Sequence, residues 1–187
     1  MYYFIPVFLI IALAIFLVSS PGKGLTGEHV IKFFVGKSKP KKNKFVISHL
    51  DFNDGTHDVH VDHIIINSQG IHVIETENMK GIIYGKESET EWEQSLEHGK
   101  RIVKFYSPIK QNNGHIYSLK KMLNTTVPFF SYIVFTKRGS LAVKTVHVPV
   151  EYPFAFSQTI KNKKTADVLD RKQAEELYHA ILDLKKK

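Results

Sequence analysis

Two acidic residues on either side of a tight turn constrain the fold of this chain more than any other feature. The segments that flank Ser68-Gln69 are apolar and β-branched, which predicts a β-hairpin with a two-residue loop. If Ser68 and Gln69 form that loop, Asp62 lies directly opposite Glu75. Side chains alternate along a strand, so both carboxylates are expected on one face, with Cβ atoms roughly 5 Å apart.

Facing carboxylates repel each other unless a cation or a proton compensates their charge. Carboxylate oxygens are hard ligands that suit Mg²⁺ or Mn²⁺. The spacing therefore predicts a divalent-metal site at Asp62 and Glu75, and the same register places His60 opposite Glu77. The alternative interpretation is an ordinary hairpin whose strands end in polar residues.

The remaining pattern predicts an α/β protein of mixed α+β type, with a mixed four- to five-stranded sheet flanked by helices. The segment 87–100 is polar around an isolated Trp92, which favours a loop or a loose helix. The short helix at 27–34 is expected to bury Val30, Phe33 and Phe34. Strands are expected at 45–52, 59–67, 70–76, 131–136 and 142–150, with a bend or short strand at 81–85, and further helices from Asn112 or Asn113 to 124 and at 170–184.

Composition restricts the partners and the kinds of site that this chain can have. The 187 residues carry a formal net charge of +8, which favours an anionic partner such as nucleic acid or an acidic membrane surface. Cysteine is absent, which excludes disulfides, thiolate zinc sites and thiol catalysis. His57, His60 and His63 lie in a predicted strand, where residues three apart point to opposite faces, so a histidine zinc site is not expected.

The first residues predict a membrane anchor. Residues 2–18 are apolar and uncharged, a length at the lower limit of about 17 residues for a spanning helix. Lysines follow this run and none precedes it, which favours an uncleaved single-pass anchor over residues 1–20, with the soluble part in the cytoplasm. A cleaved signal peptide is the alternative. A main domain is expected over 21–150, followed by an extension with an amphipathic helix over 151–187.

A lysine-rich segment at 37–44 has three open interpretations. It could be a solvated surface, a contact for anionic lipid headgroups beside the anchor, or a contact for DNA. The sequence does not rank the last two.

The order of elements resembles the PD-(D/E)XK nuclease core, and the motifs resemble the NERD, or nuclease-related, domain. The resemblance spans about 27–136, and several ordered pieces make it more specific than any single motif would be. The matching pieces are 27–30, 61–66, 70–78, 80–85, Trp92 and 107–116.

The resemblance implies a restriction-endonuclease-like core and metal-assisted hydrolysis of a phosphodiester, with nucleic acid, DNA above all, as the partner. Asp62 and Glu75 would bind Mg²⁺ or Mn²⁺, the Thr76 carbonyl would be a third oxygen ligand, and Glu28 would reach the same site. At the start of the crossover helix, Gln111 and His115 could face a phosphate or could be surface residues.

One position departs from the family pattern. Where a lysine is expected two residues after the glutamate, this chain has Glu77. Three outcomes follow: Lys80 or Lys86 replaces the missing cation, Glu77 joins a second metal site, or the domain has lost catalysis and serves as a binding or structural module.

Overall fold

The computed structural model describes residues 30–136 and 139–185, and its centre is a mixed five-stranded sheet. The strand order is β1-β2-β3-β7-β9, in which β1, β2 and β3 are antiparallel neighbours and β3, β7 and β9 run parallel. This confirms the predicted mixed sheet. The strands are β1 (Phe45–Asn53), β2 (Asp58–Asn67), β3 (Gly70–Glu77), β7 (Phe129–Phe135) and β9 (Val150–Glu151).

The predicted hairpin register is confirmed from the turn to the middle of the strands. Asn67 pairs with Gly70, and the ladder continues to His63 opposite Ile74. The two faces of this hairpin enter different parts of the core, as alternation requires. Ile64 and Val73 pack in one apolar cluster, and Ile65 packs in another on the opposite face.

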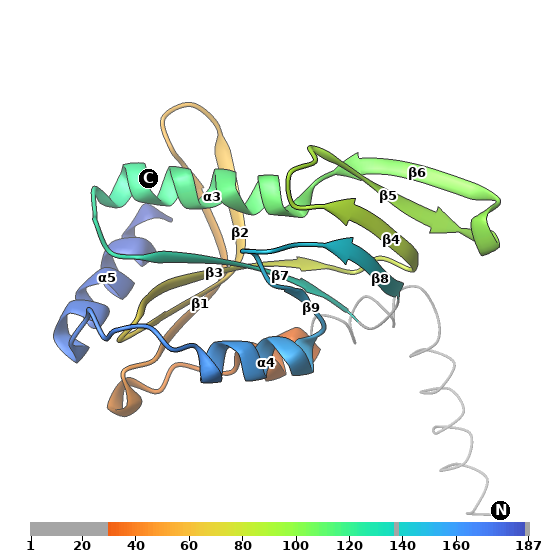
Figure 1. The fold of residues 1–187 in the computed structure, drawn as a ribbon. Helices are drawn as coiled ribbons and strands as arrows, with labels where there is room; N and C mark the ends of the chain where they lie inside the picture. Colours follow the sequence, from red (N-terminus) through yellow and green to blue (C-terminus); the bar gives the residue numbers. More distant parts are fainter. Residues whose placement is uncertain (1–29, 137–138, 186–187) are drawn as a thin grey trace, which may run out of the picture.

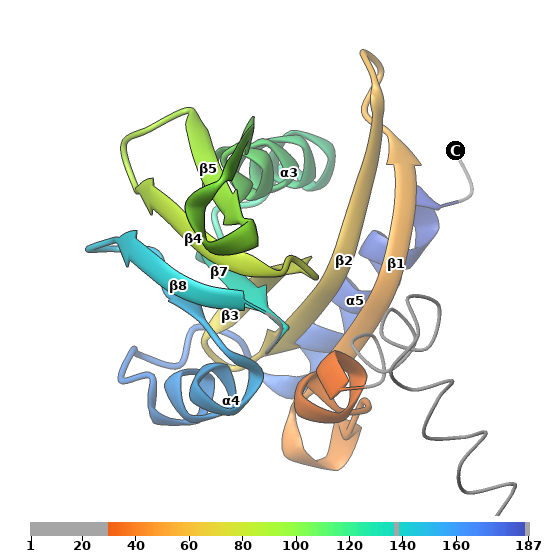
Figure 2. The same cartoon turned by 90° about the vertical axis from the view of Figure 1, so that its right-hand side faces the viewer.

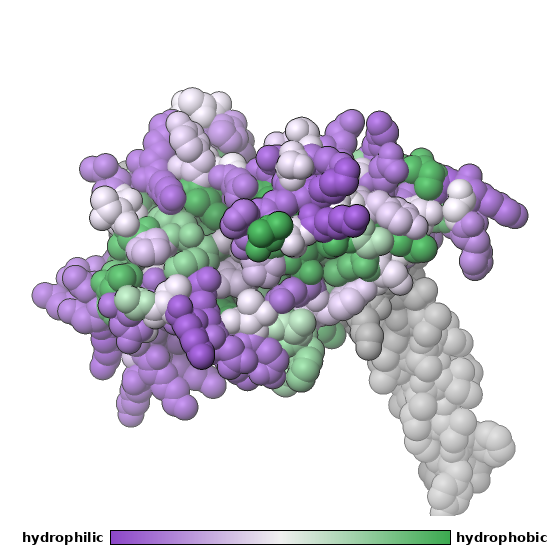
Figure 3. Space-filling view, viewed as in Figure 1, coloured by the Kyte–Doolittle hydropathy of each residue, from purple (hydrophilic) through white to green (hydrophobic). Residues whose placement is uncertain are grey.

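Helices cover both faces of the sheet (Figure 1). The helix α3 (Pro108–Leu123) crosses the face that carries Ile64 and Val73, and α5 (Arg171–Leu184) packs beside it against β1 and β2. The other face is covered by α4 (Pro153–Asn162) and the short helix at 30–35. Hydrophilic residues cover most of the face in Figure 3, and hydrophobic ones show in a band between α3 and α4.

A second, four-stranded sheet extends from the end of β3, where the sequence predicted mostly loop. Its order is β6-β5-β4-β8, with β4 parallel to β8 and the other pairs antiparallel. The prediction of a loop or helix at 87–100 was wrong, because Trp92 is fully buried and seals this sheet against α3 and β7. The strands are β4 (Gly81–Lys86), β5 (Glu91–Leu96), β6 (Arg101–Tyr106) and β8 (Gly139–Lys144), and a 3-10 turn (η2, Glu97–Gly99) joins β5 to β6.

Three further predictions need correction. The strand expected at 142–150 is two strands, of which β8 belongs to the second sheet and β9 to the first. The helix α3 begins at Pro108 rather than at Asn112 or Asn113, because proline suits a first helical turn. In the helix at 30–35 the buried residues are Ile31 and Val35, whereas Phe33 is 80% exposed.

The predicted membrane anchor at residues 1–20 lies outside the described residues. Within residues 30–136 and 139–185, no helix has the length and apolar character needed to cross a bilayer.

Candidate functional site

The carboxylates gather where β2 and β3 separate. The ladder ends at His63 and Ile74, one residue before Asp62 and Glu75 would pair. Beyond this point the β1–β2 hairpin extends away from β3 on the side of α3 (Figure 2). The Asp62 carboxylate fills the opening, and its Oδ2 accepts hydrogen bonds from the Thr76 amide at 2.8 Å and the Thr76 hydroxyl at 2.6 Å. Asp62 thus takes the place of a backbone carbonyl at the end of the ladder.

Glu75 is held by side chains from the first half of α3. Gln111 Nε2 donates to Glu75 Oε1 at 2.7 Å, and His115 Nδ1 lies 3.3 Å from Glu75 Oε2. The Glu75 side chain is only 8% exposed, and burial, the largest cause, raises the pKa of its carboxyl. Asp62 raises this pKa further while His115 lowers it, which places the three groups close enough to act on one another.

Glu77 is the third member of this acidic cluster. Burial, and then the negative charges of Glu75 and Asp62, raise the pKa of Glu77 to about 7. A lysine at this position would carry a positive charge between those two carboxylates. With glutamate there, the cluster can hold up to three negative charges, and its ionisation is coupled to its neighbours.

The predicted pairing of His60 with Glu77 is wrong. Its ring bridges two aspartates instead, with Nδ1 2.6 Å from Asp51 Oδ1 and Nε2 3.2 Å from Asp62 Oδ1. The hydrogen bond to Asp51 is the main reason that the pKa of His60 is raised. The correction follows from β2 pairing with β1 at this point, opposite Asp51, after it has separated from β3.

The two candidate lysines lie along the second sheet. Lys80 is exposed just before β4, and its carbonyl oxygen accepts a hydrogen bond from Gln94 Nε2. Lys86 forms an ion pair with Glu89 at 3.0 Å. The charges that act most strongly on Glu77 are those of Glu75 and Asp62. The Glu89 ion pair occupies Lys86, and the role of Lys80 as a replacement cation stays a prediction.

The expected roles of Glu28, as a residue that reaches the site, and of the Thr76 carbonyl, as a metal ligand, stay predictions. Glu28 lies outside the described residues. For Thr76 the structure shows its amide and hydroxyl bound to Asp62, while the proposed role of its carbonyl stays a prediction. In the part of the chain that is described, no group of three or more His, Cys, Asp or Glu side chains has an arrangement suited to a metal ion.

Sequence reasoning missed Asn112, which fixes α3 over the site. Its side chain is fully buried, and Nδ2 donates to Val73 O at 3.0 Å and to Ser131 Oγ at 2.8 Å. These bonds join the helix to β3 and β7 one residue away from Gln111. Asn112 lies three residues after Ile109 on the apolar stripe of α3, and that position was the available signal.

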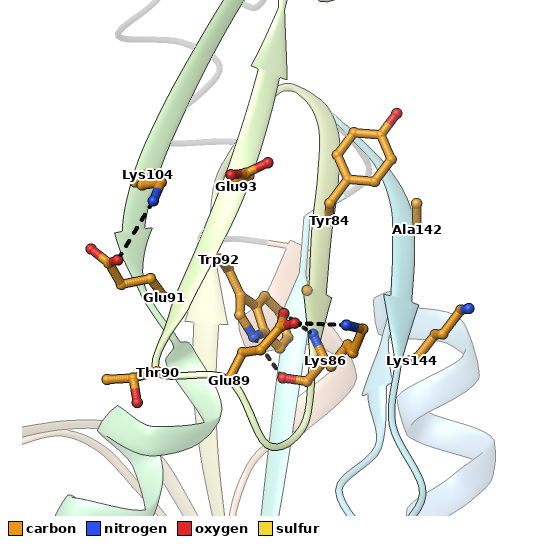
Figure 4. A pocket seen from close by; sticks show the side chains of 11 residues that line it. Tyr84, Lys86, Glu89, Thr90, Glu91, Trp92, Glu93, Lys104, Ala142 and Lys144 are labelled. Carbon is orange, nitrogen blue, oxygen red and sulfur yellow. Dashed lines mark hydrogen bonds and ion pairs between the residues drawn. The ribbon is translucent and has the colours of Figure 1, made fainter.

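A cavity of about 660 Å³ opens on the second sheet and is separate from the acidic cluster (Figure 4). Tyr84, Lys86 and Lys144 line it, and the ion pairs Lys86–Glu89 and Lys104–Glu91 stand at its rim. Because acidic and basic side chains alternate around it, its lining favours neither an anion nor a cation.

Comparison with known proteins identifies the family of this chain. Residues 23–136 match the family model of the nuclease-related domain, NERD. The chain belongs to the NERD family. It is also 29% identical over 165 residues to an uncharacterized protein of Bacillus anthracis, a match that covers 86% of this chain and 76% of that relative. No solved structure matches the chain.

Proposed function

We propose that this protein is a metal-dependent nuclease that hydrolyses phosphodiester bonds in DNA. The observation that carries the proposal is the convergence of Asp62, Glu75 and Glu77 at the point where β2 and β3 separate, with Gln111 and His115 of α3 held against Glu75. Membership of the nuclease-related family supports the reaction class, and a restriction-endonuclease-like core is consistent with the mixed sheet and its crossover helix.

The residues present fit a hard divalent cation by their chemistry. Asp62 and Glu75 supply carboxylate oxygens, which Mg²⁺ and Mn²⁺ prefer. The pKa of Glu75 and of Glu77 is raised first by burial and then by the negative charge of neighbouring carboxylates, which a cation would neutralise. When bound, the ion would lower the pKa of a water molecule and neutralise charge on the phosphate.

The protein's own residues have positioning roles in this proposal. Thr76 fixes one oxygen of Asp62 through two hydrogen bonds and leaves Oδ1 turned toward His60. Gln111 and His115 orient Glu75, and Asn112 fixes the helix that carries them. Gln111 also lies at the end of the first turn of α3, where the helix dipole favours a phosphate, whereas His115 lies one turn further along.

Glu77 determines how active such a site can be. In its neutral form it can donate a hydrogen bond to a phosphate oxygen, whereas in its ionised form it repels the substrate. Its raised pKa allows both forms near pH 7. We therefore expect the enzyme to work with Glu77 in place, and replacement of this residue by lysine to increase the rate.

The test uses the full-length protein in a detergent-containing buffer, incubated with plasmid DNA and Mg²⁺ or Mn²⁺ at low salt, because phosphate contacts weaken with ionic strength. We expect cleavage by the parent protein and a loss of about 100-fold or more in Asp62→Asn, since a metal ligand supplies several kcal/mol of transition-state stabilisation. Asp58→Asn, an exposed change in the same strand, is the matched control.

The result for Glu77→Lys distinguishes an active nuclease from a nuclease fold without catalytic activity. Cleavage by Glu77→Lys alone, with none by the parent, would show a nuclease fold that has lost catalysis. If no variant cleaves and none binds DNA at low salt, the nuclease proposal fails.

A further inference from the structure

Four lysines surround a single cavity at the turn end of the β2–β3 hairpin, away from the acidic cluster. The cavity has a volume of about 430 Å³, a size typical of small-ligand sites. Lys39, Lys42 and Lys44 reach it from the segment that contains the short 3-10 helix η1 (Pro40–Lys42), and Lys161 reaches it from α4. The other lining residues are uncharged, so the cavity is strongly electropositive.

Within the described residues, these lysines have no carboxylate as an ion-pair partner. Among residues 30–136 and 139–185, none of the four forms an ion pair with a carboxylate. Lys44 Nζ donates to Val35 O at 2.6 Å, which leaves two of its three N–H groups for a ligand. Burial, and then the charges of Lys39 and Lys161, lower the pKa of Lys44, so these two lysines are close enough to act on Lys44.

The wall of the cavity is a fixed polar surface. Asn67 Oδ1 accepts hydrogen bonds from the Gln69 amide at 2.9 Å and from His72 Nε2 at 3.0 Å. Gln69 Nε2 donates to Lys163 O at 2.7 Å, and this bond joins the hairpin turn to the segment after α4. The nearest acidic side chain in this network, Asp167, accepts a hydrogen bond from Ser68 Oγ. Hydrogen bonds thus fix the part of the cavity wall that the hairpin turn supplies.

We propose that this lysine cavity binds a phosphate group, carried either by a small free anion or by the headgroup of an anionic lipid. Several uncompensated ammonium groups facing one concave surface match a compact group with two negative charges and several acceptor oxygens. A chloride-sized anion would leave most of the donors unused, and a carboxylate offers fewer acceptor oxygens.

A nucleic-acid strand fits this cavity less well. Ile65 of the cavity and Glu75 of the acidic cluster lie on opposite faces of the sheet. Asp62 and Asn67 are also five residues apart along β2, roughly 16 Å at the rise of a strand. A strand bound at the carboxylates would have to bend around the edge of the sheet to enter. The inference is therefore independent of the nuclease proposal, and either can fail alone.

The test is calorimetric titration of the full-length protein, in detergent at low salt, with inorganic phosphate and with glycerol 3-phosphate. Lys42 and Lys161 are exposed, so their replacement should leave the fold intact. We expect Lys42→Glu/Lys161→Glu to weaken binding about tenfold or more, because it removes two charge-assisted contacts. Lys100→Glu/Lys172→Glu makes the same charge change on exposed lysines elsewhere and should bind as the parent does.

Each result is informative. Tighter binding of glycerol 3-phosphate than of phosphate would indicate a lipid headgroup, and equal binding would indicate a free anion. Absence of binding by both probes, or an equal loss in the control pair, would overturn the proposal. Binding of a 12-nucleotide DNA that the cavity variant loses, and that neither probe displaces, would also overturn it and assign the surface to nucleic acid. Lys42→Gln/Lys161→Gln repeats the comparison without charge reversal.

Discussion

The two ends of the β2–β3 hairpin carry opposite charge on opposite faces of the same sheet. At the end where the strands separate, Asp62, Glu75 and Glu77 form an acidic cluster, and at the turn end four lysines surround a cavity. The acidic side chains stand on regular strands and are largely buried under α3. The lysines come mainly from a loop and are solvated, with only Lys44 half-buried.

The difference in burial between the carboxylates and the lysines indicates how a fold tolerates like charges close together. Buried carboxylates need fixed donors, which Thr76 supplies to Asp62 and Gln111 supplies to Glu75, with His115 3.3 Å from Glu75. Burial, and then the charge of Asp62, raise the pKa of Glu75. Solvated lysines repel weakly because water screens them, so they need no such partners. We therefore expect changes at the acidic end to alter stability through hydrogen bonds and charge, and changes at the turn end to act through backbone packing.

The largest effect on stability is expected from Gly70→Ala at the turn end. Gly70 has a φ of 136°, and a Cβ there would collide with the backbone oxygen of Pro128, which also accepts the Ile71 amide. Because that oxygen belongs to the backbone, the clash cannot be relieved by a rotamer change, and we expect a loss of about 3 kcal/mol or more in the free energy of unfolding. Urea unfolding followed by circular dichroism measures this loss.

Gly55→Ala is the matched control. Gly55 also has a positive φ, of 89°, but a Cβ there meets no atom within 4 Å. Backbone strain alone should cost about 1 kcal/mol. If both variants unfold at the same urea concentration, backbone packing does not fix the turn end. The expectation that changes at the turn end act through packing would then be wrong.

The central hairpin and the last helix could be predicted from sequence, because each has a strong local signal. The apolar alternation around Ser68-Gln69 set the register, and Asp170 with Gln173 forms a capping box at the start of α5. The second sheet had no such signal. Its strands are short, and their exposed positions mix charged residues with apolar ones such as Ile82 and Ile102. The sheet depends on a contact in which Gly85 packs directly against the Trp92 ring.

Sequence reasoning selected the acidic residues of the candidate site but missed side chains that hold them in place. Spacing along two strands placed Asp62 and Glu75 on one face, and the expected start of the crossover helix pointed to Gln111 and His115. The bond of His60 to Asp51 could not be foreseen, because it depends on where β2 leaves β3 and stays with β1. Periodicity gives the face of each residue but not the point at which two strands separate.

A smaller effect is expected from Asn112→Ala at the acidic end. The change removes hydrogen bonds to Val73 O and Ser131 Oγ and leaves both acceptors in a buried site. We expect a loss of about 2 kcal/mol in the free energy of unfolding, together with reduced cleavage of DNA, because α3 also carries Gln111 and His115. Asn113→Ala, at the next and exposed position, should change stability by less than about 0.5 kcal/mol. Equal losses in the two variants would show that Asn112 does not position the helix.

The smallest effect is a pH dependence that belongs to Glu77. Its pKa is about 7 in the folded protein, whereas a glutamate ordinarily has a pKa of 4.5, so the folded state binds more protons than the unfolded state between these limits. Glu77 is neutral in both states below about pH 4.5, and its destabilising charge develops as the pH rises toward 7. Wild-type stability should therefore fall with rising pH across this window, relative to a variant that cannot ionise.

The free energy of unfolding of Glu77→Gln, relative to the parent, should therefore be about 1–2 kcal/mol larger at pH 7.5 than at pH 5. This value is smaller than the full pKa shift would give, because Glu77 retains some contact with water. The unfolding experiments are run with a chelator, since a cation held by Asp62 and Glu75 would remove the repulsion. Glu93→Gln, an exposed change on β5, is the control and should show no such difference. If the Glu77→Gln advantage is the same at both pH values, the acidic end is as well solvated as the lysine cavity, and the physical distinction between the two ends disappears.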